Sequence, residues 1–279
     1  MKNKPKETEE TMKYRLFASD MDGTLLLPDG SISERAVAAI RAWEAVGGYF
    51  TLATGRPFCG VRRYTAALSL RTPLILYNGA AVADAQSGRL LYERCLCPSD
   101  AEKILAFADE NRVTACIWSG EKLFVNRLSE RAYAYRVPFG IDPLPIENAP
   151  AEVRDSITKI LFYDDRDRIA FLQKKAATLE MTGTIFATSS PTFLEFTHCE
   201  ASKGNALLWL ADRLGIAKEA TAAIGDGMND LSLLRAAGLG IAMGNAAASL
   251  KAAAGFVTGA NTEDGLALAL EELLAHPRP

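Results

Sequence analysis

The chain has 279 residues, a length that fits one large domain or two modest ones with a sizeable core. Its composition is 49% hydrophobic and 23% charged, which excludes a collagen-like, coiled-coil or wholly disordered chain. The net charge is −3 and no apolar run approaches the ~20 residues of a membrane span, so we expect neither a nucleic-acid partner nor a membrane association.

The chain begins with a polar segment. Residues 1–12 are rich in lysine and glutamate and lack the apolar stretch of a secretory signal, so we expect a disordered, solvated tail. The five cysteines of the chain are scattered, and their odd number favours reduced thiols over a disulfide framework or a zinc site. The missing signal and this cysteine usage predict a cytoplasmic location.

Strands and helices alternate in the next part of the chain. Residues 15–19 form a short, mostly apolar run that stops at acidic residues, which is typical of a buried strand. Ser33 can cap a helix over 33–46. Further elements are expected as a strand over 49–53, a helix over 61–70 and a strand over 73–77. This β-α-β-α-β order predicts a parallel sheet with right-handed crossovers.

The middle of the chain has a different pattern, in which a helix is followed by paired strands, and this pattern occurs twice. Helices are expected over 101–111 and from after residue 163 to about residue 179. Strands are expected over 114–118, 122–126, 159–163, 184–189 and 192–196. The pattern predicts a small α+β domain with an antiparallel sheet and a weak internal duplication. A hairpin over 80–96 fits this domain or the preceding one.

The alternating pattern returns after residue 202. Helices are expected over 203–214, 230–237, 247–253 and 265–274, and strands over 220–224, 240–243 and 256–258. The pattern therefore predicts one α/β domain that is interrupted by an inserted domain.

Polar turns follow four of the predicted parallel strands. They are Asp20-Met21-Asp22, Thr54-Gly55-Arg56, Asn78-Gly79 and the run from Gly225 to Asp230, and Lys203 begins the helix at which the parallel pattern returns. Ligands of open parallel sheets bind beyond the carboxyl ends of the strands, so we expect these groups to meet at one rim.

These residue types suit phosphoryl transfer, which needs a nucleophile, a divalent cation, cationic or hydroxyl donors and a proton relay. Asp20 and Asp226 can supply carboxylates to Mg²⁺, and a carboxylate can itself attack phosphorus to form an aspartyl-phosphate. Asp22 can offer its backbone carbonyl to the metal and its side chain to the leaving-group oxygen. Gly23 permits the tight turn, and Thr24 can tie the loop together.

The run from Asp20 to Leu26 resembles the first motif of the haloacid dehalogenase-like (HAD) hydrolase superfamily. The runs Ala53-Thr54-Gly55-Arg56, Ser202-Lys203-Gly204 and Gly225 to Asp230 are similar to its second, third and fourth motifs, in that order. Residues 77–80, 243–246, 257–258 and 263–265 further resemble its Cof-type branch, class IIB with a C2B cap. The resemblance covers nearly all of residues 14–275.

The resemblance implies a Rossmann-like parallel-sheet HAD core over residues 1–83 and 199–279, with an inserted α+β cap domain over 84–198. The approach to the lysine motif, residues 199–202, departs from the usual apolar and acidic linker, which affects the detail of the hinge and not the chemistry.

The family also implies catalytic roles. Asp20 would attack phosphorus, and Asp22 would protonate the leaving alcohol and then activate water. Lys203 would neutralise the phosphate and the nucleophile. Mg²⁺ would be held by Asp20, Asp226 and the backbone of Asp22, with Asp230 in support of the site.

Phosphate binding is implied for a second group of residues. Thr54 and Gly55 would hydrogen-bond the transferring group, Asn229 would help to hold it, and Asn78 would lie near the phosphate or the hinge of the cap. Asn229 and Asp230 can also serve as helix caps, which is the less favoured alternative, and a role in a cap does not exclude one in catalysis. For Arg56 a structural ion pair and a substrate contact stay equally open.

Three functions are compatible with these residues. The family favours a phosphatase for small phosphorylated metabolites, such as sugar phosphates or phosphorylated cofactors, with a cap that excludes bulky substrates. The alternatives are a hexose-phosphate phosphotransferase or mutase of the same superfamily and a non-catalytic module that binds phosphometabolites. The sequence leaves the substrate, the specificity residues of the cap and the choice between monomer and homodimer open.

Overall fold

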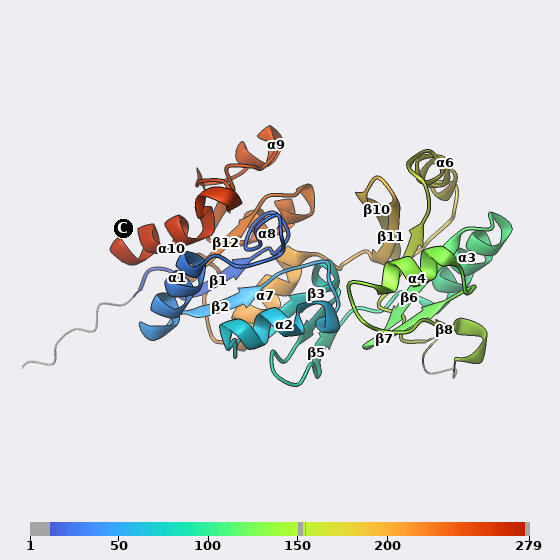
Figure 1. Ribbon diagram of the computed structural model, residues 1–279, viewed down its shortest axis with the longest axis horizontal. Helices are drawn as coiled ribbons and strands as arrows, with labels where there is room; N and C mark the ends of the chain where they lie inside the picture. Colours follow the sequence, from blue (N-terminus) through green and yellow to red (C-terminus); the bar gives the residue numbers. More distant parts are fainter. Residues whose placement is uncertain (1–11, 150–152, 154, 277–279) are drawn as a thin grey trace, which may run out of the picture. The chain divides into compact units, whose positions relative to one another are not determined.

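The computed structural model describes residues 12–149, 153 and 155–276 (Figure 1). All of the predicted tail except residue 12 lies outside these residues. The chain divides into two compact units, the first made of Met1–Leu52 with Leu207–Pro279 and the second of Ala53–Ala206. Within the described ranges no helix has the length and apolar character required to cross a membrane.

A parallel sheet forms the centre of the first unit. Its strand order is β14 (Phe256–Val257), β13 (Leu239–Ala242), β12 (Thr221–Gly225), β1 (Leu16–Ser19) and β2 (Tyr49–Leu52). Every neighbouring pair in this order is parallel, as predicted. All four residues of β1 are buried, which is why this strand is mostly apolar rather than alternating.

Helix α1 (Glu34–Ala45) covers part of this sheet. Its N-terminus is capped by the Ser33 side chain, which accepts a hydrogen bond from the Ala36 N–H. Trp43 packs edge-on against Phe17 of β1 at a centroid distance of 5.7 Å, and Phe17 stacks on Phe50 of β2 at 5.9 Å. These aromatic contacts join the helix to two neighbouring strands of the core.

The first unit contains further α-helices. They are the C-terminal part of α7 (Lys203–Arg213), α8 (Leu231–Ala236), α9 (Ala248–Lys251) and α10 (Gly265–Ala275). The helix predicted from residue 230 begins instead as a 3-10 turn over Met228–Asp230, and α8 follows it. Arg35 of α1 forms a two-point ion pair with Glu271 of α10, at 2.9 and 2.6 Å.

The second unit begins with a small antiparallel sheet. Its order is β3 (Leu74–Leu76), β4 (Ala81–Ala83) and β5 (Leu90–Glu93), and α2 (Phe58–Leu68) precedes it. The hairpin predicted over 80–96 is thus present. The predicted third parallel strand, β3, is linked in parallel fashion only through an isolated bridge from Ala53 to Ile75, and its regular pairing is antiparallel with β4.

The predicted α+β cap region contains a larger, mostly antiparallel sheet. Its order is β10 (Thr184–Ser190), β11 (Phe193–His198), β9 (Lys159–Tyr163), β6 (Thr114–Ser119), β7 (Lys122–Val125) and β8 (Leu144–Pro145). The associated helices are α3 (Pro98–Glu110), α4 (Glu130–Arg136) and α6 (Arg166–Ala176). Short 3-10 turns elsewhere in the described chain span Tyr77–Gly79, Ile146–Asn148, Lys218–Ala220 and Asn261–Glu263.

Alternation along β9 separates the two faces of this sheet. Ile160 and Phe162 belong to an apolar core that also contains Ile104 of α3 and Leu172 of α6. Lys159 begins the strand and lies on the opposite face. The same face carries Trp118, whose indole N–H donates to the Tyr135 hydroxyl oxygen of α4 at 3.1 Å.

Asp100 of α3 is a buried carboxyl that joins this helix to the segment before β10. It accepts hydrogen bonds from the N–H groups of Thr182, at 3.1 Å, and Gly183, at 2.9 Å. Burial acts to raise the pKa of Asp100, but the Gly183 and Thr182 N–H groups outweigh burial and hold this pKa below its ordinary value of 3.8.

We therefore expect Asp100→Asn to lower the free energy of unfolding by about 1–3 kcal/mol at pH 7, because an amide donor then faces buried N–H groups. A carboxyl with a lowered pKa stabilises the fold above its unfolded pKa of about 4, and this stabilisation is lost as the pH falls through the folded pKa. Urea denaturation at pH 7 and below pH 4 tests both expectations. The exposed Glu102→Gln on the same helix is the control, and equal midpoints for both variants at pH 7 would refute the role of Asp100.

Candidate active site

Asp20 lies directly beyond the carboxyl end of β1. Its N–H donates to the Ile224 carbonyl of β12 at 3.0 Å, which extends the parallel pairing by one residue. The residue is 6% exposed, whereas Asp22, two positions further, is exposed. The Met21 carbonyl accepts from the Leu26 N–H at 2.8 Å and so closes the turn that follows Asp20 and contains Asp22.

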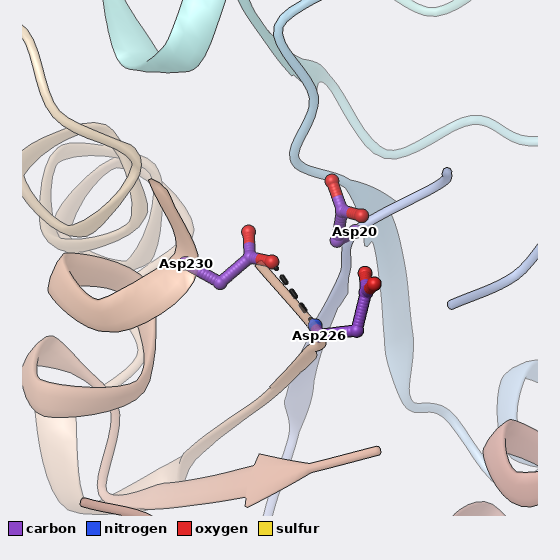
Figure 2. A group of neighbouring side chains, drawn as sticks. All are labelled: Asp20, Asp226 and Asp230. Carbon is purple, nitrogen blue, oxygen red and sulfur yellow. Dashed lines mark hydrogen bonds between the residues drawn. The ribbon is translucent and has the colours of Figure 1, made fainter. Parts of the chain in front are cut away.

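Asp226 follows β12, the strand beside β1, so the two carboxylates emerge at the same edge of the sheet. One carboxylate oxygen from each of Asp20, Asp226 and Asp230 lies within 4.8 Å of the others. Figure 2 shows the Asp226 carboxylate below Asp20, and the Asp230 carboxylate directed at the Asp226 main-chain nitrogen. The parallel register thus brings together two aspartates that are about two hundred positions apart in the sequence.

Gly23 permits the close approach of the two acidic loops. It has a φ of +79°, and a Cβ atom at this position would overlap Asp226 Oδ2 and lie 2.8 Å from Asp226 Cγ. Thr24 Oγ1 donates to Asp226 Oδ1 at 3.0 Å, so this side chain joins its loop to the one that carries Asp226. The carboxylate of Asp226 is therefore held against the loop that carries Asp20.

Asn245 is a further residue of this site, and it belongs to the motif over residues 243–246, for which no role was predicted. Its amide nitrogen donates to the Gly23 carbonyl at 2.8 Å and to Asp226 Oδ2 at 3.4 Å. Asn245 follows β13, so its position after a strand end was the signal that could have identified it. It connects a third strand end to the acidic pair.

Asp230 orients the loop that carries Asp226. Its Oδ2 atom accepts from the Asp226 N–H at 3.1 Å and from the Gly227 N–H at 2.9 Å (Figure 2). The residue is fully buried, and a Cβ at Gly225 would lie 2.5 Å from its Cβ. Asp230 thus holds the main chain of the Asp226 loop through one oxygen, and its supporting role at the metal stays a prediction. Asn229, the neighbouring predicted residue, is exposed.

The acidic group fits a hard divalent cation. Carboxylate oxygens of like charge within 4.8 Å repel one another unless a cation or protons compensate them. Mg²⁺ prefers one or two carboxylates together with water and phosphate oxygens, and Asp20 and Asp226 offer such a donor set. The described residues gathered here contain neither histidine nor cysteine, which distinguishes the donor set from that of a typical zinc site.

The other predicted site residues belong to the second unit, where Thr54 and Asn78 are directly connected. The Asn78 N–H donates to the Thr54 carbonyl at 2.9 Å, and Thr54 Oγ1 accepts from the Arg56 N–H at 3.2 Å. Tyr77 and Asn78 have consecutive left-handed φ angles of 51° and 55°. Non-glycine residues rarely adopt this conformation, and such local strain is concentrated at functional sites.

Lys203 is the first residue of α7 and is fully buried. Gly79, with a φ of +93°, lies against the main chain just before it, because a Cβ at Gly79 would overlap the Ser202 carbonyl and lie 2.7 Å from the Lys203 nitrogen. The absence of a side chain at Gly79 therefore sets the position of the predicted catalytic lysine relative to Asn78.

No thiolate competes with the aspartates as a nucleophile among the cysteines near this turn. All five cysteines are unpaired thiols, as expected. Cys59 follows the Thr54 turn at the start of α2, and burial, with a smaller contribution from Glu121, raises its pKa to about 12. Burial also raises the pKa of Glu121, which accepts from the N–H groups of Phe58 and Cys59 at 3.3 and 2.9 Å. Cys59 therefore stays protonated at neutral pH.

Paired carboxylates at the ends of adjacent parallel strands form a site suited to a divalent cation in an α/β protein. Residues 17–270 match the family of haloacid dehalogenase-like hydrolases. The chain belongs to this family, which confirms the resemblance of its motifs to those of HAD hydrolases.

Three similar proteins illustrate the relationship. YxeH of Bacillus subtilis is 34% identical over 270 residues, covering 94% of this chain and 98% of that protein. The 5-amino-6-(5-phospho-D-ribitylamino)uracil phosphatase YcsE of the same organism is 31% identical over 268 residues, covering 94% and 96%. A haloacid dehalogenase-like hydrolase of Bacteroides thetaiotaomicron has a similar structure, with a TM-score of 0.84, 26% identity and coverage of 94% and 100%. The similarity thus extends over both units of the chain.

We expect Gly79→Ala to destabilise the protein far more than Gly140→Ala. Both glycines have positive φ angles, but a Cβ at Gly140 would meet no atom within 4 Å. Gly140→Ala should therefore cost about 1 kcal/mol of backbone strain, and Gly79→Ala at least about 2 kcal/mol more. Urea denaturation of both variants measures the difference, and equal losses would contradict the close approach at Gly79.

Proposed function

We propose that the chain is a magnesium-dependent phosphatase that hydrolyses small phosphorylated metabolites through an aspartyl-phosphate on Asp20. The observation that carries this proposal is the pair of carboxylates at the ends of β1 and β12, within 4.8 Å of each other. Asp20 is the only aspartate of the motif that continues the parallel pairing of β1, and this main-chain bond restrains its position beside the carboxylate of Asp226. Such restraint favours a positioned nucleophile.

The metal site would consist of the carboxylates of Asp20 and Asp226 and the backbone carbonyl of Asp22. When bound, Mg²⁺ would offset the charge of the phosphate and of the two carboxylates. Thr24 and Asn245 hold Asp226 from one side, and Asp230 fixes its main chain from the other. This support restricts the rotamers of Asp226, as a preorganised metal ligand requires.

Asp22 would serve as the proton relay. Its carboxyl is exposed, so it can exchange protons with solvent and approach the oxygen of a leaving alcohol. It would protonate this oxygen while Asp20 attacks phosphorus, and would then accept a proton from the water that hydrolyses the acyl-phosphate. The two aspartates would thereby divide nucleophilic and acid–base catalysis between them.

Phosphate binding would fall to Thr54, Gly55, Asn78 and Asn229, with Lys203 as the compensating cation. The hydroxyl of Thr54 and the N–H of Gly55 are donors suited to a phosphoryl oxygen. Lys203 is buried, and a buried ammonium group needs an anionic partner such as a carboxylate or phosphate. These roles were expected from the sequence and stay predictions.

The substrate class is supported by relatives. YcsE is named as a 5-amino-6-(5-phospho-D-ribitylamino)uracil phosphatase, and an HMP-PP phosphatase of Citrobacter koseri is 31% identical over 237 residues. We infer that this chain also acts on a small phosphorylated metabolite, either a sugar phosphate or a phosphorylated cofactor. The cytoplasmic location, the absence of a nucleic-acid partner and a monomeric or homodimeric state likewise stay predictions.

Replacement of the nucleophile tests the central claim. We expect Asp20→Asn to lower kcat for phosphate release by about 10³-fold or more, because an amide cannot form the acyl-phosphate. The assay measures inorganic phosphate released from a panel of phosphorylated sugars, nucleotides and cofactors. Asp29→Asn, an exposed aspartate of the same unit, is the matched control. Substantial activity in Asp20→Asn would exclude Asp20 as the nucleophile.

Removal of the metal is a separate test. A chelator should abolish phosphate release, and excess Mg²⁺ should restore it, because two neighbouring carboxylates then regain their counter-charge. We expect Asp226→Asn to raise the Mg²⁺ concentration required for half-maximal activity by about 10- to 100-fold. The exposed Asp212→Asn of α7 should leave this concentration unchanged. Activity that persists through chelation would contradict a magnesium-dependent mechanism.

A further inference from the structure

We propose that Lys159, on the sheet of the predicted cap, is a positioning residue for phosphoryl transfer. Its ammonium group orients the Gly55–Arg56 peptide, and this peptide in turn orients the hydroxyl of Thr54. The proposal rests on the phosphatase function above and assigns part of its geometry to a side chain about a hundred positions away from the Thr54 turn.

Lys159 and Glu195 form a buried ion pair. The Nζ atom of Lys159 lies 3.3 Å from Glu195 Oε1, and the side chains of the two residues are only 3% and 11% exposed. Lys159 begins β9, and Glu195 lies on the neighbouring strand β11, opposite Leu161. Because Lys159 and Leu161 are on the same face of β9, the two charges are diagonal neighbours across the strand pair.

A buried charge is costly unless further hydrogen bonds satisfy it, so its other partners indicate what it does. Besides Glu195, the Lys159 ammonium group donates to the Gly55 carbonyl oxygen at 3.3 Å. It also lies 5.9 Å from the centroid of the Tyr77 ring, a contact within the range of cation–π attraction. Both of these partners belong to the segments that carry Thr54 and Asn78.

The bond to Gly55 has a direct consequence for Thr54. The Gly55 carbonyl and the Arg56 N–H belong to one planar trans peptide, so they point in opposite directions. Lys159 holds the carbonyl, and the N–H donates to Thr54 Oγ1 at 3.2 Å. A threonine oxygen that accepts from the main chain directs its own hydrogen away from that donor. The lysine therefore helps to decide where the Thr54 hydroxyl can donate.

Glu195 supports the same turn from a second side. Its Oε2 atom accepts from the Asn78 amide nitrogen at 3.4 Å, while Oε1 is bound by Lys159. The Asn78 N–H in turn donates to the Thr54 carbonyl at 2.9 Å. The ion pair thus restrains the Thr54 turn twice, because Lys159 contacts Gly55 and Glu195 contacts Asn78.

The test compares Lys159→Met with Lys103→Met. Lys103 also donates to a main-chain carbonyl, that of Glu180, but this contact has no link to Thr54. We expect Lys159→Met to lower kcat by about 10- to 100-fold with KM changed less than about 3-fold, because misplaced donors weaken the transition state more than the bound substrate. Lys103→Met should keep both constants. The folded fraction of each variant is measured by circular dichroism and used to correct kcat.

The double variant Lys159→Met/Glu195→Gln keeps the proposal testable if the single variant, which retains the buried charge of Glu195 without that of Lys159, folds poorly. It removes both buried charges, so its thermal stability should exceed that of Lys159→Met, while kcat should stay low because Gly55 still lacks its donor. Recovery of the wild-type kcat in the double variant would overturn the proposal and leave a purely structural ion pair. So would a kcat for Lys159→Met equal to that of Lys103→Met. Absence of turnover in the wild-type protein over the whole panel would instead refute the proposed phosphatase function.

Discussion

The parallel pairing of β1 with β12 is the constraint on which the acidic site depends. It places Asp20 and Asp226 at the same edge of the sheet with carboxylate oxygens within 4.8 Å, a separation that like charges tolerate only with compensation. The strand pairing sets the short distance between the two carboxylates, and the surrounding residues make room for it. Gly23 has no side chain that would overlap Asp226, and Thr24 donates to the Asp226 carboxylate. Asp230 accepts a hydrogen bond from the Asp226 main-chain N–H.

In the second unit, close main-chain contacts rather than neighbouring carboxylates constrain the predicted site residues. Tyr77 and Asn78 adopt left-handed conformations, and Gly79 allows the chain before Lys203 to approach. Strain of this kind persists where the surroundings over-determine it. Here those surroundings include hydrogen bonds to Thr54 and the buried pair of Lys159 and Glu195. A local turn next to the proposed phosphate donors is therefore stabilised by a strand far along the chain.

Sequence reasoning succeeded where a local pattern carried the information. The strand over 159–163 was predicted to the residue, and Ser33 caps α1 as expected, because apolar runs and caps act over a few neighbouring positions. It missed α4, which has seven residues and too few turns to show a helical period. It also missed the antiparallel pairing of β3, because the partner of a three-residue strand is decided by tertiary contacts.

The sequence alone determined the class of chemistry, since aspartates after apolar runs and a lysine at a helix start were recognisable by residue type and order. It also determined the family, and with it the predicted roles of Asp20, Asp22, Asp226 and Lys203. Only the tertiary structure revealed the contacts of Asn245 and Lys159, because neither lies in a local pattern that predicts its partner. Their roles depend on strand register, which joins distant positions through pairing and burial rather than through sequence proximity.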